Sequence, residues 1–354
     1  MKRFKKIGVL TSGGDAPGMN AAVRAVVRGA LSNGVEVSGI YRGYSGLIDG
    51  DIRMLGLRDV SNTINKGGTV LYSDRCPELK TPEGIAKAVE ICKRFEIDGI
   101  VTIGGDGTFR GATALTLNGI PCIGIPGTID NDISSTDHTI GFDTASNTAL
   151  DLVDKLRDTC ESHARCNVIE VMGRGAGDIA LVTAVASGAT AVAIPEFNFD
   201  QESLISRIKS SKKLGKRNFI VIVSEGLGSD YAPALAKKIE SNTGIETKFA
   251  RFAHIVRGGT PTLRDRVLAT KMGTYAVDKL IAGESNLVIC ERHDRIVAKD
   301  ISSALMLDRM YKGNITEDEL AEIDEASLAI MKKECEERRE RMRVLYEIGN
   351  RISL

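Results

Sequence analysis

The chain has 354 residues, with 42% hydrophobic and 27% charged side chains, which is enough for two compact domains or for one large α/β unit with two lobes. Its 47 Lys and Arg balance its 47 Asp and Glu, so no strong positive field favours general nucleic-acid binding. The 37 Gly against 8 Pro and no Trp indicate a chain with many close backbone approaches rather than a disordered one.

The seven cysteines are scattered and form no C-x-x-C pair, which argues against a disulfide framework or a zinc site and fits a reducing cytosol. The basic start runs after a few apolar residues into a glycine turn, so we expect a first strand there and not a signal peptide. Polar residues and glycine interrupt the longest apolar run, Ile179–Ile194, which predicts a buried helix and strand rather than a membrane span. We therefore expect a soluble, cytoplasmic protein.

Short β-branched runs alternate with helical patterns along almost the whole chain. The predicted strands are Lys6–Leu10, Glu36–Ile40, Gly99–Ile103, Cys122–Ile125, Val168–Val171, Ala191–Ile194, Phe219–Val223 and Leu287–Cys290. The predicted helices are Met19–Ser32, Glu83–Phe95, Phe109–Leu117, Asp143–Ser162, Asp178–Ser187, Gln201–Lys213, Tyr231–Ser241 and Arg264–Ala282. This alternation predicts an α/β fold with mainly parallel sheets, in which ligands bind at the carboxyl ends of the strands.

The segment Ile315–Asn350 differs from the rest because it is dense in Glu, Arg and Lys at helical spacings. We expect one or two amphipathic helices there. A solvated helix packed on the second lobe is favoured over a dedicated partner-binding element.

The first glycine turn, Thr11–Asn20, follows the first predicted strand and opens a helix. Consecutive glycines let backbone N–H groups approach an anion, and the helix N-terminus adds partial positive charge. The chain has no Walker A sequence, and a simple tight connection between strand and helix is an equal alternative for this turn.

The second turn, Gly104–Thr108, reads GGDGT and again joins a strand to a helix. A carboxylate among glycines suits a Mg²⁺ ion that bridges phosphate oxygens, because Mg²⁺ takes one or two carboxylates together with substrate phosphates. NAD kinases and lipid kinases carry a similar motif, so this turn predicts nucleotide phosphates without identifying the acceptor.

The third turn, Pro126–Asp132, places Asp130 and Asp132 on either side of an amide side chain. One carboxylate at such a turn could act as the base for a hydroxyl group while the other orients a metal or a neighbouring group. A capping turn rich in Asp and Asn is the structural alternative.

Six motifs follow one another in the order TSGGDAPGMNA, GGDGT, PGTIDND, MGRGAGD, SEG and HIVRGG. In this order they closely resemble the ATP-dependent 6-phosphofructokinases of the bacterial type, over about Lys6 to Gly313. The resemblance implies two Rossmann-like lobes with a helical C-terminal extension. Residues 1–141 and 257–306 would form the larger, ATP-binding lobe, residues 142–256 the smaller sugar-phosphate lobe, and residues 307–354 a helical segment packed on the smaller lobe.

The resemblance also implies a glycolytic kinase that moves the γ-phosphoryl group of Mg-ATP to the 1-hydroxyl of D-fructose 6-phosphate. It implies a cytosolic homotetramer in which each sugar-phosphate site borrows basic residues from a neighbouring subunit. Asp130 would be the base, and the other catalytic positions would be Gly14, Thr128, Asp132 and Arg174. The residues that hold ATP would be Gly14, Arg75, Cys76, Gly105, Asp106, Gly107 and Thr108, with Mg²⁺ on Asp106. The residues at fructose 6-phosphate would be Thr128, Ile129, Asp130, Arg165, Met172, Gly173, Arg174, Glu225, Lys248, His254, Ile255, Val256 and Arg257.

The chain departs from the family at three positions where charge matters. Lys248 stands where an Arg is usual, which keeps the charge but loses the two-nitrogen fork. The family has an effector site between subunits for a nucleoside diphosphate and phosphoenolpyruvate, and its basic residues match Arg24, Arg28, Arg58, Arg157 and Lys216. Thr190 and Leu214 replace a Glu and a Lys of that site, so weak effector responses are expected.

Three other functions compete with the ATP-dependent kinase, and each is less favoured. A pyrophosphate-dependent phosphofructokinase would resemble GGDDS and PKTIDND, whereas Gly107 and Gly127 here leave space for a nucleotide. A non-catalytic regulatory homologue would be expected to have lost an acidic group, yet Asp15, Asp106, Asp130 and Asp132 are all present. A Rossmann dehydrogenase is disfavoured because no G-x-G-x-x-G motif stands in the right context.

Overall fold

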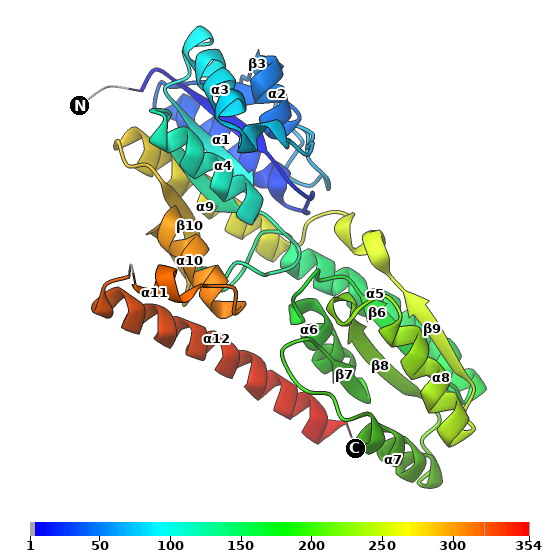
Figure 1. Cartoon of the computed structure of the whole chain (residues 1–354). Helices are drawn as coiled ribbons and strands as arrows, with labels where there is room; N and C mark the ends of the chain where they lie inside the picture. The colour runs from blue at the N-terminus through cyan, green and yellow to red at the C-terminus, as the bar shows by residue number, and fades with distance from the viewer. Residues whose placement is uncertain (1–3, 322, 354) are drawn as a thin grey trace. The chain divides into compact units, whose positions relative to one another are not determined.

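The computed structural model describes residues 4–321 and 323–353, which divide into two compact units (Figure 1). Unit 1 contains the residues up to Ile129, with Ile133–Thr144 and Arg257–Lys332. Unit 2 contains Asp130–Asp132, Ala145–Val256 and the residues from Lys333 onward.

Unit 1 is built on a seven-stranded sheet in the order β11-β10-β5-β4-β1-β2-β3. Its strands are β1 (Lys6–Thr11), β2 (Glu36–Ile40), β3 (Ile52–Met54), β4 (Gly99–Gly104), β5 (Cys122–Pro126), β10 (Leu287–Arg292) and β11 (Arg295–Asp300). The inner strands pair in parallel, and β3 and β11 pair antiparallel at the two edges. β4 and β5 are buried along their full length, as parallel strands covered on both faces must be.

Helices cover both faces of this sheet. The helices and turns of unit 1 are α1 (Met19–Ser32), α2 (Gly43–Asp49), α3 (Pro82–Arg94), α4 (Asp106–Leu117), α9 (Leu263–Ile281), α10 (Ile301–Tyr311), α11 (Glu317–Ala321) and the short 3₁₀ turn η1 (Glu78–Lys80). α1 and α9 pack closely, since a Cβ added at Gly273 would lie 2.7 Å from the Cβ of Ala25.

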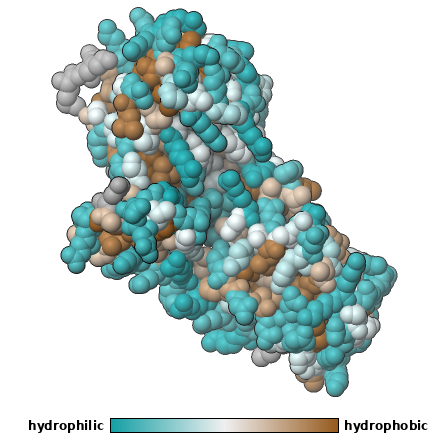
Figure 2. All heavy atoms as spheres, in the orientation of Figure 1, coloured by the Kyte–Doolittle hydropathy of each residue, from teal (hydrophilic) through white to brown (hydrophobic). Residues whose placement is uncertain are grey.

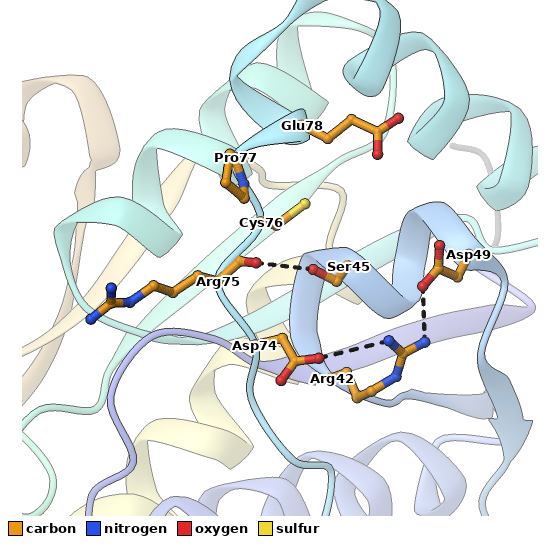
Figure 3. A pocket seen from close by; sticks show the side chains of 8 residues that line it. All are labelled: Arg42, Ser45, Asp49, Asp74, Arg75, Cys76, Pro77 and Glu78. Carbon is orange, nitrogen blue, oxygen red and sulfur yellow. Dashed lines mark hydrogen bonds and ion pairs between the residues drawn. The ribbon is translucent and has the colours of Figure 1, made fainter.

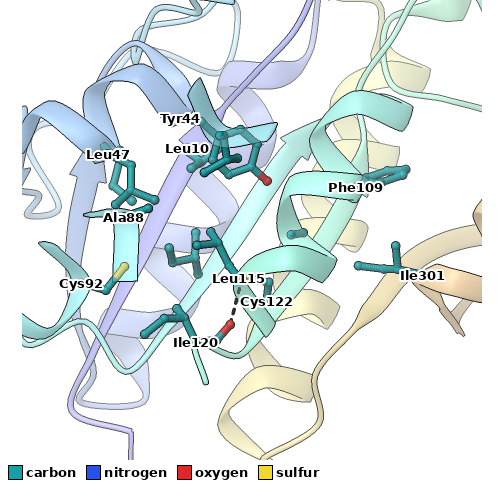
Figure 4. Packing of buried hydrophobic residues seen from close by; sticks show 14 of the residues in the cluster. Leu10, Tyr44, Leu47, Ala88, Cys92, Phe109, Leu115, Ile120, Cys122 and Ile301 are labelled. Atoms are coloured by element: carbon teal, nitrogen blue, oxygen red, sulfur yellow. Dashed lines mark hydrogen bonds between the residues drawn. The ribbon is translucent and has the colours of Figure 1, made fainter. Parts of the chain in front are cut away.

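The opposite face of the sheet carries the apolar cluster of unit 1 (Figure 4). Side chains from α2, α3, α4 and α10 meet the strands there, and Phe109, Leu115 and Leu47 are fully buried. Burying side chains of this size contributes about 1.5–3 kcal/mol each to folding. The cluster fixes α4, whose first turn carries the GGDGT motif.

Unit 2 has a four-stranded parallel sheet in the order β7-β8-β6-β9. Its strands are β6 (Cys166–Val171), β7 (Ala191–Ala193), β8 (Phe219–Ser224) and β9 (Thr247–Arg251). The helices and turns that lie wholly or partly in unit 2 are α5 (Phe142–His163), α6 (Asp178–Ser187), α7 (Gln201–Lys213), η2 (Glu225–Leu227), α8 (Tyr231–Thr243), η3 (Ala253–Arg257) and α12 (Glu325–Ile352). An apolar cluster lies between the sheet and helices α7 and α8.

Polar side chains cap the N-termini of several of these helices, each from the residue directly before the helix. The hydroxyl of Thr81 accepts a hydrogen bond from Gly84 N at the start of α3, with Pro82 in the first helical position. Asp200 accepts from two backbone N–H groups of α7, and Asp300 accepts from Ser303 N of α10. Each such cap satisfies a backbone donor that the helix itself leaves open.

The predicted α/β class with mainly parallel sheets is confirmed, and the structure contains all eight predicted strands and all eight predicted helices. The prediction missed β3, β9 and β11, which are short or partly exposed and have little alternation between apolar and polar residues. It also missed α2 and α10. The predicted tail segment is divided, because residues 307–332 group with unit 1 while residues from Lys333 group with unit 2.

Within the described residues, no helix is both long and apolar enough to cross a membrane. On the face drawn in Figure 2, hydrophilic residues predominate and apolar residues occur in small groups. Of the seven cysteines, only Cys76 is partly exposed, and the other six are buried.

Candidate active site

The first glycine turn lies between β1 and α1 in unit 1. Gly13 has a φ of 87°, which a side chain would disfavour. The guanidinium of Arg257 lies against this turn, because a Cβ at Gly14 would lie 2.8 Å from its Nη1 and that nitrogen donates to Asp15 O at 3.2 Å. The structure therefore brings together Gly14 and Arg257, two predicted site residues that are far apart in the sequence.

The second turn is bound directly to the first. Ser12 O accepts from the hydroxyl of Thr108 at 3.2 Å, and Thr108 O accepts from the phenol of Tyr44 at 2.6 Å. Gly104 has to be glycine, because a Cβ there would lie 2.3 Å from both Ser12 O and Thr108 Oγ1. Thr108 thus has a structural role in holding the two turns together.

Gly105 and Gly107 face open space, since a Cβ at either position meets no atom within 4 Å. Both lie at the start of α4, where backbone N–H groups have no partner inside the helix. An anion can approach them closely without displacing any side chain. This is the arrangement that a phosphate-binding turn requires.

Asp106 is half-buried and has one carboxylate oxygen that makes no hydrogen bond to any of the described residues. Its Oδ1 is buried and has no hydrogen-bond partner among the described residues, while Oδ2 lies 3.6 Å from Lys312 Nζ. An ionised carboxylate with one such oxygen fits the Mg²⁺ predicted here. Within the described residues, no group of three or more His, Cys, Asp or Glu could hold a metal. A Mg²⁺ ion on Asp106 would take its other ligands from phosphate oxygens and water.

The carboxylate of Asp308 in α10 is buried and lies near Asp106. The sequence analysis missed it. Its Oδ1 accepts a hydrogen bond from Ser134 N, and its side chain is almost fully buried. Burial and, to a lesser degree, the charge of Asp106 raise the pKa of Asp308 above the ordinary carboxyl range. No glycine motif or charge pattern marks Asp308 in the sequence.

The third turn leaves β5 and is held by backbone hydrogen bonds within unit 1. Gly127 N donates to Gly104 O at 3.0 Å, and Thr128 N donates to Ile140 O at 3.1 Å. A Cβ at Gly127 would lie 3.1 Å from side-chain atoms of Ile103 and Met19, which are both fully buried. Gly127 therefore faces the apolar core, and the expectation that it leaves space for a nucleotide is wrong.

The remainder of this turn belongs to unit 2. Asp130 and Asn131 are buried and Asp132 is half-buried. Asn131 has a φ of 52°, in the left-handed region that Asn tolerates better than most residues.

Arg75 and Cys76 line an open pocket of about 380 Å³ in unit 1 (Figure 3). Arg75 O accepts from the hydroxyl of Ser45 at 3.3 Å, which leaves the guanidinium of Arg75 pointing away from that contact. Arg42, another lining residue, is paired with Asp49 at 2.9 Å and with Asp74 at 3.7 Å. Two predicted ATP residues thus lie together on one pocket wall.

In unit 2 the turn Met172–Asp178 follows β6, and the carboxylate of Glu225 lies against it. Glu225 Oε1 accepts from Gly173 N at 3.2 Å and from Arg174 N at 2.7 Å. Arg174 is exposed and has a φ of 54°. The structure thus brings together Gly173, Arg174 and Glu225, three of the residues predicted to bind the sugar phosphate. One carboxylate oxygen of Glu225 already accepts hydrogen bonds from the turn backbone.

Two further predicted phosphate ligands are held by a carboxylate that the sequence analysis did not single out. Glu246 Oε2 lies 2.6 Å from Arg165 Nε, and Glu246 Oε1 lies 2.7 Å from Lys248 Nζ. These two cations lower the pKa of Glu246 to about 2. A neighbouring pair, Arg251 and Glu170, is joined by two hydrogen bonds of 2.6 and 3.1 Å.

The HIVRGG segment spans the end of unit 2 and the return to unit 1. The side chains of His254 and Ile255 are exposed, whereas Val256 is fully buried. Val256, with 0% of its surface exposed, therefore presents no surface to a ligand, unlike the two residues before it.

The predicted effector residues fall in both units. Arg24 and Arg28 lie on α1 and Arg58 follows β3. In unit 2, Arg157 donates to Asn218 Oδ1 at 3.2 Å and Lys216 Nζ lies 3.5 Å from Ser353 O. Burial and the charges of Arg157 and Arg207 lower the pKa of Lys216, so these three cations lie close together.

Comparison with known proteins identifies the family. A family model described as phosphofructokinase matches residues 6–280. The chain is 53% identical over 302 residues to an ATP-dependent 6-phosphofructokinase of Bacillus velezensis, covering 85% of this chain and 94% of that protein. It is 52% identical over 312 residues to the enzyme of the same name from Bacillus subtilis, covering 88% of this chain and 97% of that protein.

A solved structure of phosphofructokinase from Saccharomyces cerevisiae is similar to 92% of this chain, with a TM-score of 0.83 and 31% identity. The chain spans about half of that longer protein, 48% of its length. The sequence resemblance is thus confirmed both by identity along nearly the full length of bacterial relatives and by the fold. The chain belongs to the phosphofructokinase family.

Proposed function

We infer that this chain is an ATP-dependent 6-phosphofructokinase, which transfers the γ-phosphoryl group of ATP to the 1-hydroxyl of fructose 6-phosphate. The observation that carries this conclusion is the identity of 52–53% with enzymes of that name over 94–97% of their length. The products are fructose 1,6-bisphosphate and ADP.

ATP is favoured over pyrophosphate as the donor by the open space at Gly107. A carboxylate at that position would place negative charge at the start of α4, where the nucleotide phosphates would lie. A non-catalytic homologue is not favoured, because the chain keeps Asp106 and Asp130.

The proposed role of Asp106 is to hold the Mg²⁺ of Mg-ATP with its buried, unpartnered oxygen. When bound, the ion would neutralise charge on the phosphate oxygens of the donor. The N–H groups at Gly105 and Gly107 would bind the same phosphates, and Arg75 and Cys76 would line the nucleotide pocket in unit 1. Unit 1 is accordingly proposed as the ATP-binding lobe.

Phosphoryl transfer needs positioning and charge neutralisation more than covalent chemistry. Asp130 is proposed as the base that takes the proton from the 1-hydroxyl, a role worth about 10²–10⁴ in rate. Its burial supports a role in a desolvated site. Arg174 would stabilise the charge of the transferring group, and Glu225, whose other oxygen is not used by the turn backbone, would accept from sugar hydroxyls.

The 6-phosphate of the sugar would be held by Arg165, Lys248, His254 and Arg257, in unit 2 and at its return to unit 1. Arg165 and Lys248 both pair with the same anion, the Glu246 carboxylate, which supports the proposal that the two cations can bind one phosphate together. In the family some of these residues are borrowed from a neighbouring subunit, so we propose a cytoplasmic homotetramer. Its effector site would include Arg24, Arg28, Arg58, Arg157 and Lys216.

A coupled assay of the purified protein with fructose 6-phosphate tests the proposed function, with ATP, GTP and pyrophosphate compared as donors. The expected result is turnover with ATP and none with pyrophosphate. Turnover with pyrophosphate alone, or turnover with no donor, would overturn it.

A further inference from the structure

Arg338 of α12 lies at a position where an apolar side chain is expected. The neighbouring buried residues of α12 follow at helical spacing on the same face and are Met331, Cys335 and Met342. Arg338 is 4% exposed, whereas Arg339 and Arg343 of the same helix are exposed. Arg is almost never buried to this extent unless it is paired.

The guanidinium of Arg338 binds two segments that are far from α12 in the sequence. Its Nη2 donates to Asn131 O at 2.6 Å and lies 3.3 Å from each carboxylate oxygen of Asp178. Asn131 Nδ2 donates to Asp178 Oδ1 at 3.1 Å. The three residues therefore form a closed, partly buried hydrogen-bond network within unit 2.

Asn131 and Asp178 both belong to turns of the proposed active site. Asn131 stands between Asp130 and Asp132, and its left-handed φ of 52° directs the peptide that carries the accepting carbonyl. Asp178 ends the turn that begins at Met172 and is the first residue of α6. A single guanidinium thus connects the turn of the proposed base to the turn proposed to lie along the sugar phosphate.

Charge balance supports the same contact. The side chain of Asp178 is 12% exposed, and burial raises the pKa of its carboxyl group while the charge of Arg338 lowers it. Arg338 therefore favours the ionised carboxylate, which accepts from both Asn131 and the guanidinium. Without Arg338 the carboxylate would lose its ion pair and Asn131 O would lose a charged donor.

We propose that Arg338 is a positioning residue of the phosphoryl-transfer reaction, which holds the Asp130–Asp132 turn in its reactive geometry through Asn131 O and Asp178. The proposal rests on the proposed role of Asp130 as the base. A base displaced by a fraction of an ångström loses efficiency without losing affinity for substrate, because orientation rather than binding is affected. The effect of removing Arg338 therefore falls on kcat.

The test compares four full-length variants with the wild-type protein. Arg338→Met removes charge and donors at similar length, and Arg338→Lys keeps the charge but lacks the planar fork. Arg338→Met combined with Asp178→Asn leaves no unpaired carboxylate and guards against loss of the fold. Arg343→Met is the matched control, because Arg343 is exposed on the same helix and pairs with the exposed Glu340 at 2.9 Å.

For each folded protein, kcat, KM for fructose 6-phosphate and Tm are measured. The expected result is a kcat at least tenfold below wild type for Arg338→Met, with KM changed by less than threefold, a smaller loss for Arg338→Lys, and wild-type values for Arg343→Met. In the double variant, Tm returns toward wild type while kcat stays low, since Asn131 O still lacks the hydrogen bond from Arg338. A purely structural role would restore kcat together with Tm.

A kcat within twofold of wild type in folded Arg338→Met, or in the double variant when Arg338→Met does not fold, overturns the proposal. If neither of these folds, Arg338→Lys decides it by the same criterion. The wild-type rate is an independent reference: lack of wild-type turnover contradicts the proposed function, whereas normal wild-type turnover with unaffected variants contradicts the role of Arg338 alone.

Discussion

The carboxyl group of Asp308 makes the stability of unit 1 depend on pH in a predictable direction. Its native pKa is raised by burial and by the charge of Asp106, so the native state holds this proton to higher pH than the unfolded chain does. The contribution of this carboxyl group to the free energy of unfolding is fully present below the ordinary carboxyl pKa of about 4. It is lost as the pH rises from there through the raised pKa of the native state. Each unit of separation between the two pKa values is worth about 1.4 kcal/mol.

Asp308→Asn imitates the protonated acid and keeps an acceptor for Ser134 N, so it is expected to remove this dependence. Thermal unfolding in EDTA at pH 5 and pH 8 checks it: the Tm of the variant should exceed that of wild type by more at pH 8 than at pH 5. Asp318→Asn, at an exposed position of α11, is the control and should show equal differences at both pH values. If the Tm difference between Asp308→Asn and wild type is also the same at pH 5 and pH 8, the raised native pKa of Asp308 is contradicted.

Glu246 competes with an incoming phosphate for two of the cations proposed to bind it. The carboxylate pairs with Arg165 and Lys248, and its pKa of about 2 keeps it ionised at every pH where the enzyme would be assayed. Glu246→Gln should therefore lower KM for fructose 6-phosphate about two- to fivefold, as expected for the loss of exposed ion pairs, with kcat unchanged.

Initial-rate measurements over a range of fructose 6-phosphate concentrations test this expectation. Glu284→Gln removes a comparable exposed ion pair, with Lys279 at 2.9 Å in unit 1, and should leave KM unchanged. A raised KM in Glu246→Gln would show instead that the carboxylate is needed to orient Arg165 and Lys248.

At the scale of elements, two glycines in similar sequence motifs, one at the start of α4 and one after the end of β5, have different surroundings and therefore different roles. Gly107 lies in the first turn of α4 facing open space, whereas Gly127 follows β5 and faces the buried core. Gly107→Asp is expected to keep or raise Tm, because an acidic residue near a helix N-terminus is favourable. It should raise KM for ATP at least about tenfold, because like charges in contact cost several kcal/mol.

The test measures KM for ATP and Tm of Gly107→Asp. Gly105→Ala, at an equally open position, is the uncharged control, so the comparison separates the effect of the added charge from that of the added side-chain volume. Unchanged ATP kinetics in Gly107→Asp would refute the phosphate-binding role of the α4 start. Gly127→Lys, in contrast, is expected to lower Tm, because its side chain would enter the contact with Ile103 and Met19.

The elements that carry the glycine turns could be predicted from the sequence because their signals are local. A buried β-branched run, a glycine turn and a helix follow one another within 27 residues at Lys6–Ser32 and within 19 residues at Gly99–Leu117. Arg338 and Asp308 could not be found in this way. Their partners lie 207 and 174 residues away, and their surrounding sequence is an ordinary charged or amphipathic helix.

For the whole molecule, the effector response is expected to be weak. Thr190 is buried and Leu214 is 89% exposed, so neither supplies the charge that its counterpart in the family would. Losing one charge-assisted contact costs about 1.5–3 kcal/mol, or roughly 10- to 150-fold in affinity. Lys216 and Arg207 also contact Ser353 near the end of α12, which lies beside α7 (Figure 1).

Activity at subsaturating fructose 6-phosphate, titrated with ADP and with phosphoenolpyruvate, measures this response. Small changes at millimolar effector are expected, and Leu214→Lys should strengthen them. Strong submillimolar responses of the wild-type protein to both effectors would show that other residues replace the two that are absent.

The proposed mechanism depends on Asp130 more than on any other side chain. Asp130→Asn is nearly isosteric but cannot take the proton of the 1-hydroxyl, so the most direct test is kcat of this variant with saturating ATP and fructose 6-phosphate. We predict a fall of about 10²–10⁴ with binding of fructose 6-phosphate retained. A variant that keeps more than about a tenth of the wild-type kcat would contradict the assignment of Asp130 as the base.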